Sequence, residues 1–109
     1  MGVDQVLQGL VEELSDVESV DPRSLKAYAH VVDHWSMGAG APTGFIHLTV
    51  CVLEGRSSDL LSHMADRLFL RLQGLCGRVA SPAAVTLEVR QMAPSTYRKG
   101  ALPGQGTAS

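Results

Sequence analysis

The chain has 109 residues, of which 45% are hydrophobic, and its formal net charge is −2. This length fits one compact domain, and this share of apolar residues is typical of a folded protein and excludes a disordered chain. The slight acidity, with a pI of about 6.0, argues against nucleic-acid binding, because nucleic-acid binders normally present a basic face.

The N-terminal residues are rich in acids and lack the basic start and apolar core of a signal peptide. No apolar run reaches the roughly 18 residues that a membrane span needs. We therefore expect a cytoplasmic protein. Two cysteines, Cys51 and Cys76, show no CxxC spacing and form no disulfide framework, so we expect both to be buried free thiols.

The first predicted element is an amphipathic helix over residues 3–17. It is followed by a break at residues 19–24, where Pro22 disfavours helical backbone at Asp21. Apolar side chains recur at spacings of three and four along this helix, which is the pattern of one buried stripe. The stripe consists of Val3, Val6, Leu7, Leu10, Val11, Leu14 and Val17.

Residues 25–35, LKAYAHVVDHW, alternate in a way that favours a strand. The segment 36–44, SMGAGAPTG, carries several turn signals and is predicted to be a loop. Residues 45–53, FIHLTVCVL, are rich in β-branched residues and predict a second strand. Their nearly continuous apolarity predicts burial on both faces of the sheet.

A second helix is predicted over residues 59–77, with Ser57 or Ser58 as its N-cap and Asp59 placed favourably against the helix dipole. Residues 84–90, AVTLEVR, alternate as a third strand. Residues 1–100 are expected to form the single domain, and residues 101–109 a flexible tail. The expected order is α–β–β–α–β, with the first two strands paired as an antiparallel hairpin and the helices on one face of a small mixed sheet.

The most conspicuous motif is HVVDHW, residues 30–35, because it holds two imidazoles and a carboxylate. On a strand, however, His30 and His34 lie about 13 Å apart, and Asp33 points to the opposite face. His30 could meet His47 across the hairpin, but two ligands do not make a zinc site, which needs three or four. We therefore expect strand histidines with hydrogen-bond partners and no metal.

Other catalytic motifs are absent from the sequence. There is no GxSxG elbow, and GAGAPTG lacks the spacing and the following helix of a phosphate-binding loop. Two cations remain at defined positions. Arg56 stands where a strand gives way to a helix, a place suited to binding a carboxylate, and Lys26 opens the first predicted strand. Either could instead be structural, Arg56 by capping or pairing with a neighbour and Lys26 as a solvated edge residue.

Several blocks of this sequence occur in the order and spacing of a known family. AHVVDHWSM, GFIHLTVCVLEGRS and the late LEVRQMAPSTYRKG resemble the corresponding segments of the 5-carboxymethyl-2-hydroxymuconate isomerases. These enzymes belong to the tautomerase superfamily. The resemblance covers roughly residues 5–100.

This resemblance implies a tautomerase-like α+β fold of order β–α–β–β–α–β, usually assembled as a trimer. It implies a cofactor-free proton transfer that converts an unsaturated dicarboxylate from its dienol to its conjugated keto form during aromatic-compound catabolism. Arg56 matches the family arginine that binds a substrate carboxylate. Lys26 stands where the family usually has arginine, so the charge is kept but the bidentate fork is lost.

The sequence departs from the family at its start. Family members begin with a strand headed by a proline whose amine is the general base, whereas this chain begins Met1-Gly2-Val3-Asp4 and enters a helix directly. We therefore expect little or no isomerase activity of this chain and identify no catalytic base. Three explanations of the missing proline-headed strand are open: a start site assigned too far downstream, a shortened sequence and a natural loss. The first two are favoured, because the sheet edge that a lost strand leaves exposed is an aggregation liability. The alternative function is a non-catalytic relative that retains the oligomer-forming sheet and an anion pocket.

Overall fold

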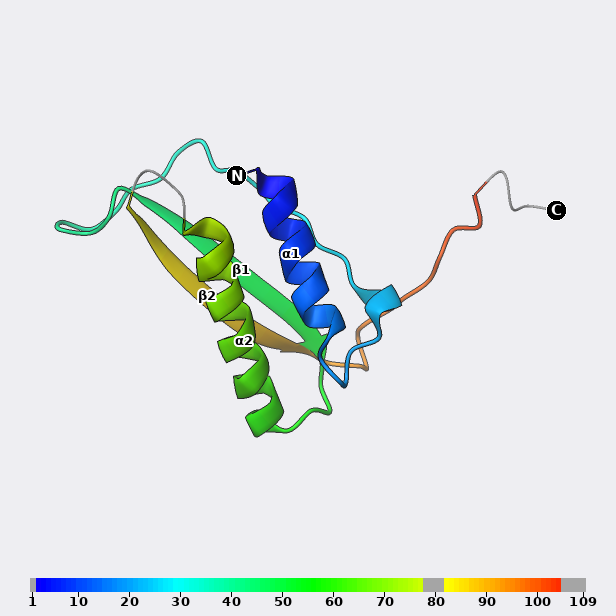
Figure 1. The fold of residues 1–109 in the computed structure, drawn as a ribbon. Coiled ribbons are helices and arrows are strands. Elements are labelled where there is room, and N and C mark those ends of the chain that lie inside the picture. Colours follow the sequence, from blue (N-terminus) through cyan, green and yellow to red (C-terminus); the bar gives the residue numbers. More distant parts are fainter. Residues whose placement is uncertain (1, 78–81, 105–109) are drawn as a thin grey trace.

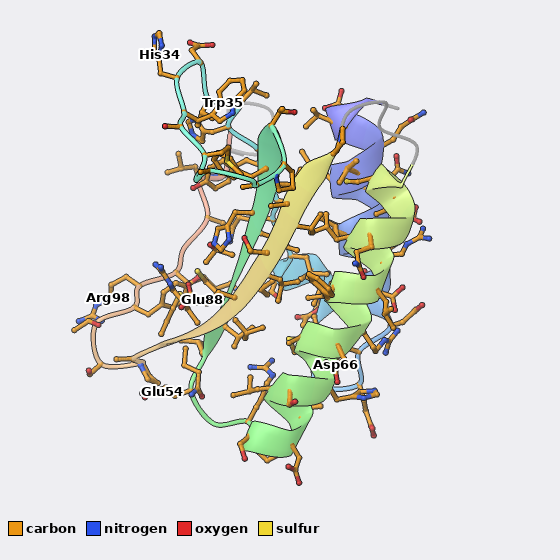
Figure 2. All side chains as sticks on the ribbon, turned by 90° about the vertical axis from the view of Figure 1, so that its left-hand side faces the viewer. His34, Trp35, Glu54, Asp66, Glu88 and Arg98 are labelled. Carbon is orange, nitrogen blue, oxygen red and sulfur yellow. The ribbon has the colours of Figure 1, made fainter. Side chains whose placement is uncertain are left out.

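The computed structural model of the chain describes residues 2–77 and 82–104. Figure 1 shows two helices, α1 (Val3–Ser15) and α2 (Ser58–Cys76), against two strands, β1 (Gly44–Leu53) and β2 (Ala83–Met92). A short 3-10 helix, η1 (Pro22–Ser24), follows α1. The protein is a small α+β fold, and the prediction that both helices pack on one face of a sheet is confirmed (Figures 1 and 2).

The strand predicted over residues 25–35 is wrong, because the chain runs there as extended, exposed backbone that joins no sheet. The predicted hairpin with the next strand is therefore also wrong, and the order among the described elements is α–β–α–β. The sheet is parallel, not mixed, since β1 and β2 are joined by the α2 crossover. Alternation is a local signal, whereas a strand also needs a partner for its backbone hydrogen bonds.

Helix α1 ends at Ser15, two residues before the predicted end, and its last turn is closed by the Ser15 hydroxyl, which donates to the Val11 carbonyl at 2.8 Å. The chain then turns into η1, where the Asp21 carboxylate accepts from the Arg23 N–H at 3.0 Å. Pro22 occupies the first position of this short helix, where its missing N–H costs nothing. The predicted break after the first helix is thus confirmed.

Helix α2 begins within one residue of its predicted start. The Ser57 hydroxyl accepts a hydrogen bond from the Leu60 N–H at 3.1 Å, so Ser57 is the N-cap. Of the two N-cap candidates predicted from the sequence, Ser57 and Ser58, the first is confirmed. Three apolar residues at helical spacing on α2, Met64, Leu68 and Leu72, are fully buried. They form the centre of a small core that also contains Leu10, Val17 and Val50.

Strands β1 and β2 pair in parallel along their full length, from Gly44 beside Ala83 to Leu53 beside Met92. Burial alternates along β1, where side chains at even positions face the helices and those at odd positions are exposed. The expectation that this strand is buried on both faces is therefore wrong for the single chain. Both helices lie on one side, so the other face of the sheet remains open (Figure 2).

The two helices approach each other closely at Gly9, which is buried in α1. A Cβ at this position would stand 2.8 Å from both methyl carbons of Leu75 on α2. Beside this contact, the Arg67 guanidinium donates to the Glu13 carboxylate through Nε at 2.9 Å and Nη2 at 2.6 Å. A small residue and a half-buried ion pair thus fix how α1 lies on α2.

Beyond β2, residues 93–104 run as an extended segment away from the helices (Figure 1). The predicted flexible tail begins within it. Residues 101–104 are exposed, and residues 105–109 lie outside the described residues. A search of the described part of the chain found no helix with the length and apolarity to cross a membrane.

The packing at Gly9 predicts different outcomes for the same substitution in the two helices. Gly74→Ala in α2, where a Cβ meets no atom within 4 Å, should stabilise the protein by about 0.5–1 kcal/mol through helix propensity. Gly9→Ala offers the same helical gain but overlaps Leu75, so its free energy of unfolding should fall at least about 1 kcal/mol below that of Gly74→Ala. Urea unfolding measures both, and equal gains would show that α1 does not approach α2 this closely.

Candidate functional site

The junction between β1 and α2 carries the arginine singled out by the sequence. Gly55 has φ of 129°, a conformation open to glycine alone, and it turns the chain from the strand toward the helix. Ser57 then caps α2, and Arg56 lies between the two. The Gly55-Arg56-Ser57 segment therefore holds the arginine at a fixed strand-to-helix turn.

The Arg56 guanidinium binds backbone and hydroxyl groups of its own chain. Its Nε donates to the Ser19 hydroxyl at 3.0 Å and its Nη2 to the Ser19 carbonyl at 3.0 Å. Its Nη1 donates to the Leu53 carbonyl at 3.3 Å. Arg56 thus connects the β1–α2 turn to the segment that follows α1 through hydrogen bonds. This is a structural role, one of the two alternatives that the sequence left open for this residue, the other being carboxylate binding.

These three hydrogen bonds, hereafter the Arg56 clasp, limit the number of N–H groups that Arg56 can donate to a ligand. A guanidinium has five N–H groups, and three of those in Arg56 are engaged. One N–H on each terminal nitrogen has no partner among the described residues, so a carboxylate can still bind that edge of the side chain. Arg56 can therefore stabilise the fold and bind an anion at the same time.

The structure does not bring the second predicted cation to this arginine. Lys26 lies just after η1 on exposed backbone, not at the start of a strand. Among the described residues, no hydrogen bond or ion pair involves its ammonium group. Lys26 and Arg56 are therefore not joined by any contact, and a ligand would have to bridge them.

The HVVDHW segment forms no metal site in the part of the chain that the structure describes, where no three His, Cys, Asp or Glu side chains converge. His34 projects near the tip of the molecule, far from the helices (Figure 2). His30 packs its ring edge against Tyr28, with centroids 5.5 Å apart. Because the hairpin is absent, His30 does not meet His47. The expected strand setting is wrong for His30 and His34, whereas His47 does lie on a strand, β1.

His47 instead belongs to a polar group on the open face of the sheet. One ring nitrogen lies 2.7 Å from the Thr86 hydroxyl on β2, and the other lies 3.0 Å from that of Thr49. Two residues after Thr86 on β2, Glu88 (labelled in Figure 2) forms an ion pair with Arg90, whose Nε lies 2.9 Å from the Glu88 carboxylate. The open face is thus polar at its centre.

Apolar side chains flank that polar centre on β1. Phe45 is 44% exposed and Leu53 is 38% exposed. This exposed face was not predicted from the sequence, although the sequence contains a signal for it. Odd positions of β1 and even positions of β2 both carry hydroxyl, imidazole or charged groups, which indicates that one side of the sheet is less apolar than the other.

The expectation of two buried thiols is only half right. Cys51 is exposed, because it points to the open face of the sheet. Cys76 is partly buried at the end of α2, and this burial raises the pKa of its thiol by disfavouring the charged thiolate. The two cysteines therefore differ in accessibility.

No protein-family model matches the sequence, and the search of curated proteins found no match.

The thiols predict a clear order of chemical modification. At pH 8, Cys51 should react with iodoacetamide at least about tenfold faster than Cys76, because Cys76 is less accessible and its raised pKa leaves less thiolate. Peptide mass spectrometry over a time course measures both rates in one sample. If Cys76 reacted as fast as Cys51, the end of α2 would not be packed as described.

The Arg56 clasp predicts a loss of stability that Lys26 does not share. Arg56→Ala removes three hydrogen bonds, two of them to backbone carbonyls, and should lower the free energy of unfolding by about 1–2 kcal/mol. Lys26→Ala is the matched control, and its effect should stay within about 0.5 kcal/mol. Urea titration compares the two variants. A neutral Arg56→Ala would mean that the guanidinium does not hold the turn.

Proposed function

We propose that the protein is a tautomerase-like subunit of an oligomeric, cofactor-free isomerase that moves a proton within an unsaturated dicarboxylate. The observation that carries this proposal is the ordered set of motifs that resemble the 5-carboxymethyl-2-hydroxymuconate isomerases. The position of Gly55-Arg56-Ser57 at a strand-to-helix junction supports it. The β–α–β unit also supports it, because α2 and the preceding helix α1 both lie on one face of its sheet.

In this proposal, Arg56 and Lys26 bind the two carboxylates of the substrate. Arg56 uses the N–H groups left free on its terminal nitrogens, and Lys26 acts as an exposed point charge. Two cations at separate positions favour a dianion over a monoanion, because each carboxylate then meets one positive group. The reaction itself is an isomerisation, so the proton removed from one atom returns to another and no cofactor is consumed. No described residue is assigned as the base.

The exposed surface of the single chain supports an oligomer. A folded monomer of 11.6 kDa is expected to expose about 5,800 Å². The chain exposes 8341 Å², an excess of about 2,500 Å² over that expectation. The extended C-terminal segment accounts for part of the excess, and the open face of the sheet and residues 26–35 contribute to the remainder.

One observation favours a second candidate, the non-catalytic anion-binding or assembly module. The Arg56 donors that face its own chain are fully engaged with Ser19 and Leu53. An arginine used in this way contributes to the fold even when no substrate is present. The two candidates share the oligomer and the anion-binding residues and differ only in turnover.

Binding and turnover measured on the same sample distinguish the two functions. Calorimetry should show saturable binding of cis,cis-muconate, a six-carbon unsaturated dicarboxylate, and at least about tenfold weaker binding of sorbate, which has one carboxylate. Lys26→Ala, which leaves the fold unperturbed, should weaken muconate binding and leave sorbate binding nearly unchanged. Lys26→Arg is the matched control and should retain it.

Isomerisation of a dienol dicarboxylate, followed by ultraviolet absorbance, decides between the candidates. Dicarboxylate binding together with turnover supports the isomerase and contradicts the expectation of little activity that follows from the missing proline. Binding without turnover supports the anion-binding module. Equal affinity for muconate and sorbate would refute the dicarboxylate specificity that both candidates assume.

A further inference from the structure

Residues 26–35, hereafter the arm, form a ten-residue extended segment without secondary structure. None of their backbone N–H or C=O groups has a hydrogen-bond partner among the described residues. The side chains are equally unprotected, since Tyr28 is 80% exposed and Val31 is 78% exposed. Val32 and Trp35 are also exposed. A continuous run of unpaired backbone with apolar side chains is therefore open to solvent in the single chain.

The composition of the arm is that of a strand. Its large apolar residues are aromatic or β-branched, the types that fit a pleated, half-buried surface. It contains no proline or glycine, which would weaken strand pairing. The arm can therefore pair as a strand, but in the single chain it pairs with nothing.

The sheet offers a matching place for such a strand. Strand β1 has ten residues and pairs with β2 along one edge only, so its other edge carries no partner strand among the described residues. A sheet of two strands is marginally stable, and a third strand adds backbone hydrogen bonds and covers apolar side chains. No charge repulsion opposes the pairing. The arm carries one lysine and one aspartate, and β1 carries no Lys, Arg, Asp or Glu.

The loop between arm and strand determines how the two can meet. The Trp35 indole N–H donates to the Thr43 carbonyl at 2.9 Å, and the Ala41 N–H donates to the Gly38 carbonyl at 3.1 Å. These bonds close the loop on itself, and in this closed form the arm does not pair with β1 of its own chain. Gly40, with φ of 81°, gives the loop a backbone conformation that other residues rarely adopt. An ordered loop therefore coexists with an unpaired arm.

We propose that the arm of one copy pairs along the free edge of β1 in a second copy. Exchange of an identical element between protomers is a low-cost route to assembly, because the receiving surface already exists in each copy. The exposed arm contributes to the excess surface of the single chain, about 2,500 Å² above the expectation for its mass, and pairing with a second copy would bury this part of it. The inference rests on the proposed oligomer and names the contact that builds it.

The pairing is tested first by breaking its hydrogen bonds in the full chain. Val31→Pro removes a backbone N–H and blocks strand pairing, so it should raise the dissociation constant of the oligomer at least tenfold in sedimentation equilibrium. Val31→Thr keeps the N–H and the β-branched shape, and it should change the constant less than threefold. Equal effects of the two variants would show that the arm backbone makes no interface bonds.

A second measurement on the unsubstituted protein shows which copy supplies the strand. In a mixed sample of isotopically labelled and unlabelled chains, filtered nuclear Overhauser spectra should connect arm residues of one copy with β1 residues of another. An oligomer with contacts between arm and β1 only within one copy, or with none, contradicts the arm exchange and leaves the proposed oligomer standing. A monomer at every concentration overturns both.

Discussion

The two helices of this chain lie on one face of its two-stranded sheet and leave the other face uncovered. This one-sided packing determines which side chains are buried and which remain exposed. Met64, Leu68 and Leu72 fill the covered side, and Leu10, Val17 and Val50 are the other buried hydrophobic side chains among the described residues. On the opposite side, Phe45 and Leu53 remain exposed around a polar centre. A parallel sheet is normally buried on both faces, so this open face is a surface that the proposed oligomer would cover.

Three specific contacts hold the covered half together. The close approach at Gly9 and the Glu13–Arg67 pair fix α1 on α2. The Arg56 clasp on Ser19 fixes the chain after α1 against the end of β1. Because these contacts join segments far apart in the sequence, they turn one β–α–β unit and a preceding helix into a single packed body.

The sequence predicted the elements whose signals are local. The α2 boundaries follow from the Ser57 cap and an apolar stripe at helical spacing, and both strands of the sheet follow from β-branched composition and alternation. The arm shows the limit of this reasoning, since its alternation is equally good but no strand of its own chain pairs with it. The position of Arg56 was predictable, whereas its partner Ser19, 37 residues away, was not.

The same limit explains the errors on burial. Apolar residues along β1 indicate a buried strand, but they do not say whether the covering surface comes from the same chain. Cys51 and the odd positions of β1 are exposed for this reason. The candidate site therefore combines Arg56, which is hydrogen-bonded within the fold, with Lys26, which is exposed to solvent. In the proposed oligomer, a neighbouring copy would help to enclose a ligand between them.

Dependence of the fold on assembly is tested most directly by the concentration dependence of unfolding. For a protein whose folded state is stabilised by association, the urea midpoint rises with protein concentration by mass action. We expect the midpoint of the full chain to rise steadily between micromolar and hundreds of micromolar concentrations. A midpoint that stays constant over this range would contradict the claim, because it would mean that the single chain is stable with one face of its sheet uncovered.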